Sequence, residues 1–143
     1  PTKPYYAVRD EYGNTKANDP FLRALAKGGF QVGALARCYV GGGVAIDTLD
    51  PEEALRRTQE LLAQDTVVLY EAAIRYRQFF VRVDVLRKTG NVLELFEAKA
   101  KSFEDEEEFF LAEKKRTPTD FLQGDWKPYF YDVAFQHWVL GKA

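Results

Sequence analysis

The sequence predicts an α/β domain in which helices flank a central mixed sheet. Three consecutive segments in the middle of the chain, over residues 66–76, 78–87 and 91–101, have the apolar patterning typical of β-strands. Segments with helical spacing lie before and after them. With 143 residues, 46% of them hydrophobic, the chain fits one domain with a buried core. We therefore expect residues 1–143 to be a single domain. Because the chain begins with Pro and contains no Met, we also expect it to be a fragment of a longer protein.

Four elements are expected before the three strands. They are a helix over residues 20–27, a second helix over 30–39, a short strand over 44–48 and a third helix over 51–64. The first and third helices have an Asp-Pro start signal, at Asp19-Pro20 and at Asp50-Pro51, in which Asp caps the helix and Pro takes its first position. The glycines at 41–43 predict the turn that ends the second helix.

The second and third strands are expected to form a hairpin. Residues 88–91 have the sequence KTGN, which is a hairpin turn signal. Successive side chains of a strand point to opposite faces. Asp84, near the end of one strand, is therefore expected to meet Glu97 and Lys99 on the same side of the sheet. This spacing alone is weak evidence of a site, because strands often carry Glu and Lys on a solvent-facing side.

The C-terminal part of the chain ends in a predicted helix over residues 129–140. On that helix, Asp132 and Gln136 lie four positions apart and share a face. Residues 104–116 are acids followed by bases, and we interpret them as a solvated surface segment. Pro, Gly and Asp in residues 117–128 predict a loop.

Charge and cysteine content limit the classes of function. A net charge of −2 and a pI of about 5.5 argue against a nonspecific basic nucleic-acid binder, although not against a nuclease with an acidic metal site. Cys38 is the only cysteine, which excludes an intrachain disulfide framework and a cysteine-based zinc site. We expect it in the core, on an apolar helix face. The single cysteine also fits a reducing cytoplasm, where we expect the protein to be. No apolar run is long enough to cross a bilayer, so we expect no membrane partner.

Asp84, Glu97 and Lys99 are the residue types that phosphodiester hydrolysis needs. The reaction requires hydroxide near neutral pH and neutralisation of the charge that builds on phosphorus, and a divalent metal supplies both. Mg²⁺ prefers oxygen ligands, few of them from protein. The two carboxylates and the carbonyl of Ala98 are candidate ligands, with Glu71 as a further acid. Lys99 is expected to orient the attacking water or stabilise the transition state.

Seven segments carry a resemblance to a known family. They are FQVGALAR at 30–37, GGGVAID at 41–47, RRTQELL at 56–62, LYEAAI at 69–74, VRVDVL at 81–86, LFEAKAKS at 95–102 and YDVAFQHWVL at 131–140. In this order they resemble the PD-(D/E)XK nuclease superfamily, in its RecB-like and CRISPR-associated adaptation-nuclease branch. They are most similar to a bacterial domain family of that superfamily with no assigned function. The resemblance covers roughly three-quarters of the chain.

The resemblance implies a restriction-endonuclease-like core and a single nuclease-like domain. It implies that Asp84 and Glu97 bind Mg²⁺ or Mn²⁺ and that Lys99 is catalytic. Glu71 matches an acidic position that often precedes these residues in the family.

Two further positions concern the substrate, and two depart from the family pattern. Gln136 matches the Gln of a downstream helix motif that positions DNA near the metal, and we place Asp132 with it as a substrate-binding residue. That motif usually ends in Tyr, where this chain has Leu140. The branch also has a metal-binding His in an early helix, and the matching position here is Gly33.

We therefore expect a metal-dependent nuclease that hydrolyses phosphodiester bonds of single- or double-stranded DNA, within a larger protein. One alternative is a catalytically inactive module that keeps the fold and binds nucleic acid. Another is a structural or interaction domain, whose partner is a protein or another domain of the same chain.

Overall fold

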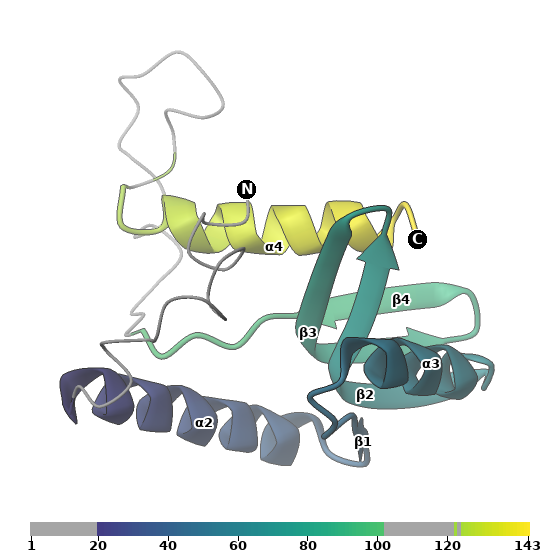
Figure 1. Ribbon diagram of the computed structural model, residues 1–143, viewed down its shortest axis with the longest axis horizontal. Coiled ribbons are helices and arrows are strands. Elements are labelled where there is room, and N and C mark those ends of the chain that lie inside the picture. Colours follow the sequence, from purple (N-terminus) through teal and green to yellow (C-terminus); the bar gives the residue numbers. More distant parts are fainter. Residues whose placement is uncertain (1–19, 102–121, 123) are drawn as a thin grey trace, which may run out of the picture.

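The structure is a computed structural model that describes residues 20–101, 122 and 124–143, apart from the side chains of residues 21–27 and 30. Asp19, with its predicted capping role, and the predicted surface segment 104–116 lie outside the described residues, as does half of the predicted loop 117–128. The described elements form an α/β fold in which helices flank a four-stranded mixed sheet, as the sequence predicts (Figure 1).

The sheet has the strand order β1-β2-β3-β4. Its strands are β1 (Val44–Ala45), β2 (Thr66–Tyr76), β3 (Phe79–Thr89) and β4 (Val92–Phe96). β1 pairs with β2 in parallel, and the other two pairs are antiparallel. A two-residue turn joins β3 to β4, and Gly90 takes the positive φ of 58° that this turn needs. The predicted hairpin is thus confirmed.

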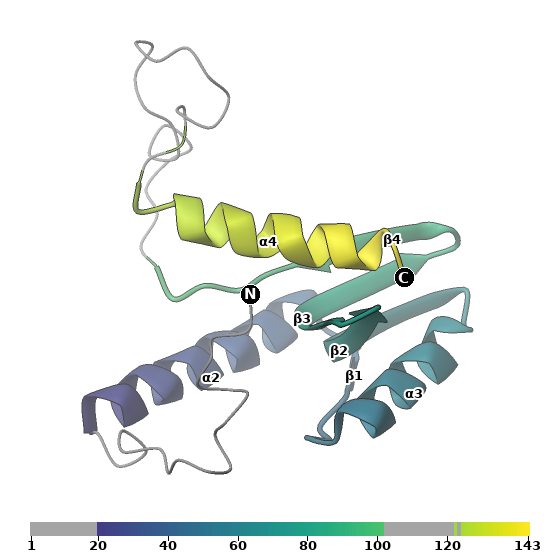
Figure 2. The same cartoon turned by 45° about the horizontal axis from the view of Figure 1, so that its top comes forward.

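Within the described part of the chain, three helices flank the sheet: α2 (Pro20–Val40), α3 (Pro51–Leu62) and α4 (Lys127–Leu140). The two views show α3 and α4 on opposite faces of the sheet (Figures 1 and 2). The N-terminal halves of α2 and α4 extend beyond the sheet on the same side. None of the described helices combines the length and the apolar character that crossing a membrane requires.

The start of α3 follows from its sequence. Asp50 has an extended backbone, and its Oδ1 accepts a hydrogen bond of 2.7 Å from the backbone N–H of Glu53. Pro51 takes the first helical position, and Glu52 and Glu53 place negative charge at the positive end of the helix dipole. This confirms the predicted start at Asp50-Pro51.

Two apolar clusters hold α3 and α4 on the sheet. One contains Val83 of β3 and Val139 of α4, both fully buried. The other contains Ala54 of α3, Ala73 of β2 and Ile46, which are at most 1% exposed. The hydrophobic effect of this burial fixes the sheet between the two helices.

The predicted division of residues 20–39 into two helices is wrong, because α2 is continuous through residues 28 and 29. A glycine inside a helix costs only about 1 kcal/mol relative to alanine, which does not end a helix with good helix formers on both sides. The expected burial of Cys38 is also wrong. Its side chain is exposed, as are those of Leu35 and Tyr39, because no described part of the chain covers this face of α2.

Two predicted strands are shorter than expected. The strand expected over 44–48 ends at Ala45, and the side chain of Arg82 donates to the carbonyl of Thr48 beyond it, at 2.8 Å. The strand expected over 91–101 ends at Phe96. Beyond it, the N–H of Ala98 donates to the side chain of Asp84 instead of to a backbone carbonyl. Asp84 itself lies in the middle of β3 rather than near its end.

Candidate functional site

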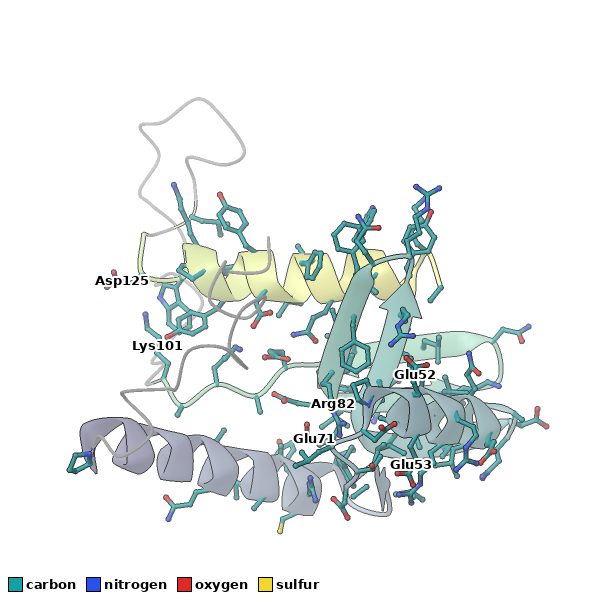
Figure 3. All side chains as sticks on the ribbon, in the orientation of Figure 1. Glu52, Glu53, Glu71, Arg82, Lys101 and Asp125 are labelled. Carbon is teal, nitrogen blue, oxygen red and sulfur yellow. The ribbon has the colours of Figure 1, made fainter. Side chains whose placement is uncertain are left out.

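The segment after β4, residues 97–101, runs between α2 and α4 (Figures 1 and 2). On one side it borders a cavity of about 380 Å³. The cavity is lined by Gly29, Gly33, Ala34, Arg37, Glu71, Asp84, Glu97, Ala98 and Lys99. At its far end the segment contacts the start of α4, where Lys101 donates to the carbonyl of Asp125 at 3.3 Å (Figure 3). We call the cavity of about 380 Å³ the carboxylate cavity.

Asp84 holds the segment against the sheet. Its Oδ2 accepts a hydrogen bond of 2.8 Å from the N–H of Ala98. Burial raises the pKa of the Asp84 carboxyl above its ordinary value. The Ala98 hydrogen bond opposes that shift, and repulsion from Glu71 adds to it. A carboxylate in this position is costly unless a cation is close to it.

Glu97 has a nearly buried side chain, of which only 8% is exposed. It accepts hydrogen bonds from Lys99 and, at 2.9 Å, from Nε2 of Gln136. Burial raises the pKa of Glu97, the two hydrogen bonds lower it, and repulsion from Asp84 raises it again, so that the net direction is upward. Both predicted metal-binding carboxyls therefore have raised pKa values for the same reasons.

Lys99 forms ion pairs with Glu97 and, at 2.7 Å, with Asp132 of α4. Burial alone would lower its pKa. The hydrogen bonds with Asp132 and Glu97 outweigh burial and raise the pKa of Lys99 to about 12. The side chain is thus an ammonium ion at neutral pH. In this arrangement it can stabilise negative charge, but it cannot remove a proton from water.

Gln136 and Asp132 do not line the carboxylate cavity, but they form hydrogen bonds with residues that do. Nε2 of Gln136 donates to Glu97 and, at 3.2 Å, to Asp132. Because both partners are acceptors, the orientation of the amide is fixed. Gln136 is only 5% exposed, and within the described part of the chain its Oε1 has no hydrogen-bond partner. The sequence predicts these two residues to bind substrate, whereas their contacts in the structure are with Glu97 and Lys99.

Glu71 has an unusual backbone for a residue in a strand. The register pairs Tyr70 with Val85 and Ala72 with Val83, so Glu71 lies opposite Asp84. Its φ is 59°, in the left-handed region that residues other than glycine rarely adopt. Such strain costs about 1–3 kcal/mol and is concentrated at functional sites.

The carboxylate of Glu71 lies between two arginines. Its oxygens are 3.9 Å from Arg37 and 3.8 Å from Arg82 (Figure 3). The Glu71 side chain is 39% exposed. Its predicted place among the metal ligands stays a prediction.

Sequence reasoning missed Arg37, which places a guanidinium in the carboxylate cavity. The end of α2 is anchored near it by the hydroxyl of Tyr70, which lies 3.2 Å from the carbonyl of Arg37 and 3.1 Å from that of Gly41. Gly43 permits this contact, since a Cβ there would lie 2.2 Å from the Tyr70 ring. The glycine run at 41–43 predicts a turn, but it does not reveal the contact with Tyr70.

The donor set suits a hard divalent cation only in part. Asp84 and Glu97 offer carboxylate oxygens from two neighbouring segments of one cavity, and Mg²⁺ needs few protein ligands. Among the described residues, no three or more Asp, Glu, His or Cys side chains are grouped so as to hold a metal ion. A metal here would therefore rest on two carboxylates, completed by backbone carbonyl, water and substrate oxygens.

The structure thus gathers five of the predicted residues around one cavity. They are Glu71, Asp84, Glu97, Ala98 and Lys99. Gln136 and Asp132 join them through hydrogen bonds. The chain matches no protein-family model, and no curated protein or solved structure matches it either.

Proposed function

We propose that this chain is a metal-dependent nuclease of the PD-(D/E)XK type, with a restriction-endonuclease-like core, that hydrolyses DNA phosphodiester bonds. The observation that supports this proposal most is the convergence of Asp84, Glu97 and Lys99 on one cavity. Two carboxyls with raised pKa values and a permanently charged ammonium meet there. This combination suits an anionic substrate that binds together with a divalent cation.

Each residue has a role that its contacts suggest. Asp84 and Glu97 hold Mg²⁺ or Mn²⁺, with the Ala98 carbonyl and Glu71 as further donors, and the bound cation supplies hydroxide and neutralises charge. Lys99, fixed by its ion pairs, presents an ammonium to the pentavalent phosphate. Arg37 offers a guanidinium to a phosphate oxygen in the same cavity.

Asp132 and Gln136 act as positioning residues in this proposal. Asp132 holds the ammonium of Lys99, and Gln136 holds the carboxylate of Glu97. Fixing these groups before the substrate arrives lowers the entropy cost of reaching the transition state.

A second candidate function is a fold that has lost catalysis and binds nucleic acid or a protein. One observation favours it: Lys99 already satisfies the carboxylates of both Glu97 and Asp132 without a metal. The charges of these two carboxylates are therefore balanced without a metal ion.

Calorimetric titration with Mn²⁺ and with Mg²⁺ separates these candidates. The nuclease proposal predicts one metal site in the wild type that Asp84→Ala abolishes and that Asp65→Ala, in the exposed turn before β2, leaves unchanged. A DNA-binding module without catalysis would show DNA affinity that persists after Asp84→Ala. An interaction domain would bind neither metal nor DNA.

A further inference from the structure

An apolar groove lies beside the carboxylate cavity, and the two share a wall. The groove has a volume of about 310 Å³ and is lined on the α2 side by Val32, Leu35 and Tyr39. Val85 of β3 and Phe96 of β4 line its other side. Glu97, Ala98 and Lys99 border both spaces.

Helix α2 lines the carboxylate cavity with one face and the apolar groove with another. Gly29, Gly33 and Arg37, spaced by four residues, border the carboxylate cavity. Leu35 and Tyr39, also spaced by four, border the groove. Residues four apart lie one above the other on a helix, so each space is bordered by its own stripe of α2. One stripe is glycine and arginine, whereas the other is aliphatic and aromatic.

The groove leaves large apolar side chains open to solvent. Leu35 is 67% exposed, Tyr39 is 91% exposed and Phe96 is 37% exposed. Phe96 is held in place by Arg87, whose guanidinium lies 5.0 Å from its ring centroid and is fixed in turn by two hydrogen bonds to Glu94. A rigid ring and a neighbouring tyrosine form a surface on which a flat aromatic ligand can stack.

Resting on the proposed function, we propose that this groove receives the unpaired base of the nucleotide next to the scissile phosphate. A nucleotide carries a phosphate anion beside an aromatic base. The two adjoining spaces offer matching surroundings, since the carboxylate cavity holds the proposed metal ligands together with Arg37 and Lys99, and the groove is apolar and aromatic. Stacking on aromatic side chains is tolerant of sequence. A base enters the groove only when it is free of its partner strand, so the substrate is single-stranded or frayed DNA.

The test uses a single-stranded oligonucleotide in Mn²⁺, with one abasic site moved along the strand. The inference predicts that cleavage at a given phosphate slows about tenfold when the abasic site is at one adjacent position, and is unchanged when it lies farther away. Tyr39→Ala is expected to remove this position dependence. Tyr131→Ala, an exposed tyrosine on α4 that does not line the groove, is expected to keep it.

The outcomes separate this inference from the function on which it rests. No cleavage of any substrate by the wild type would refute the nuclease proposal and this inference with it. Cleavage that is equally fast at every abasic position, or equally fast on fully paired duplex, would refute the base groove alone. A change of oligomeric state in Tyr39→Ala, with unchanged position dependence, would assign the groove to a second copy of the chain and overturn the inference as well.

Discussion

The ammonium of Lys99 lies 2.7 Å from Oδ2 of Asp132, thirty-three positions later in the chain. This ion pair joins the segment after β4 to α4, and Gln136 reinforces it by donating to both Asp132 and Glu97. The pKa of Asp132 follows from the same contacts. Burial raises it, but the hydrogen bonds from Lys99 and Gln136 outweigh burial and lower it. The pair is therefore fully charged at neutral pH.

Replacing Asp132 by Asn is expected to loosen Lys99 while leaving the proposed metal carboxylates in place. Cleavage should fall by about 10²-fold, because a poorly placed catalytic group costs that much, while Mn²⁺ affinity stays within about twofold. Single-turnover cleavage and calorimetry on the same preparation measure both. Asp125→Asn is the matched control, since Asp125 contacts Lys101 through its backbone carbonyl. Equal losses of metal affinity and cleavage in Asp132→Asn would contradict a positioning role.

The Lys99–Asp132 pair also predicts how stability depends on pH. The pKa of Asp132 is lowered on folding, so its contribution is present above its unfolded value of 3.8 and is lost as pH falls through the folded value. The pKa of Lys99 is raised to about 12, so its contribution is complete below 10.5 and is lost as pH rises toward 12. Chemical denaturation of the wild type and Asp132→Asn across pH should show a difference that shrinks at both extremes. A difference that is constant with pH would contradict the pair.

Asp84→Asn is expected to raise the thermal stability of the metal-free protein. A carboxyl whose pKa is raised on folding stabilises the fold at low pH and loses that contribution as pH rises through its folded pKa. At pH 7 the ionised Asp84 carboxylate therefore lowers the free energy of unfolding. Asn keeps an oxygen that can accept from Ala98. The melting temperature at pH 7 should rise by roughly a few degrees. Adding Mn²⁺ should then stabilise the wild type and leave Asp84→Asn unchanged.

The Asp84→Asn prediction has a control variant and one result that would contradict it. Glu94→Gln is the control, because Glu94 has a lowered pKa, caused first by its hydrogen bond with Arg87, and should not gain stability on neutralisation. A lower melting temperature for metal-free Asp84→Asn at pH 7 would contradict the prediction, because it would show that the ionised carboxylate does not destabilise the fold.

Gly33→His is expected to add a metal ligand. Gly33 lines the carboxylate cavity, and a Cβ at this position would meet nothing within 4 Å. Imidazole binds Mn²⁺ and other transition metals better than Mg²⁺, so affinity for Mn²⁺ should rise more than affinity for Mg²⁺. Gly28→His is the matched control, since Gly28 is also in α2 with open space around it but does not line the cavity. Equal effects of the two substitutions would argue against a metal site at Asp84 and Glu97.

Thr58→Val tests how α3 is fixed to the sheet. The buried hydroxyl of Thr58 donates to the carbonyl of Ala54 at 2.8 Å and accepts from the N–H of Ala73 at 3.0 Å. Valine keeps the shape but leaves the buried N–H of Ala73 without that partner, which should lower the free energy of unfolding by about 1–3 kcal/mol. Urea denaturation measures it. Thr66→Val, at an exposed position, should change stability by less than about 0.5 kcal/mol.

Local signals predicted much of the fold. The bounds of β2 agree with the strand expected from the apolar patterning of residues 66–76, and Asp50-Pro51 starts α3 through a cap that its own residues form. Elements whose ends depend on distant contacts were less predictable. The end of β4 is set where the Asp84 side chain replaces a backbone acceptor for Ala98, and no local pattern marks that exchange.

The candidate site shows the same limit. Strand alternation and the hairpin turn were enough to expect Asp84, Glu97 and Lys99 near one another. Arg37 reaches the cavity only because α2 runs without a break and is tied to Tyr70, which no local signal predicts. The contact of Asp132 with Lys99 depends on how α4 packs, and its spacing from Gln136 revealed only a shared helix face.

Cleavage of DNA by the full chain tests the central claim most directly. Single- and double-stranded DNA are incubated with Mn²⁺ or Mg²⁺ and the wild type, Lys99→Ala or the control Lys142→Ala, at an exposed C-terminal lysine. The account predicts metal-dependent cleavage by the wild type and by Lys142→Ala, and its loss in Lys99→Ala with metal binding retained. No cleavage by the wild type with either metal, or equal cleavage by Lys99→Ala, would contradict it.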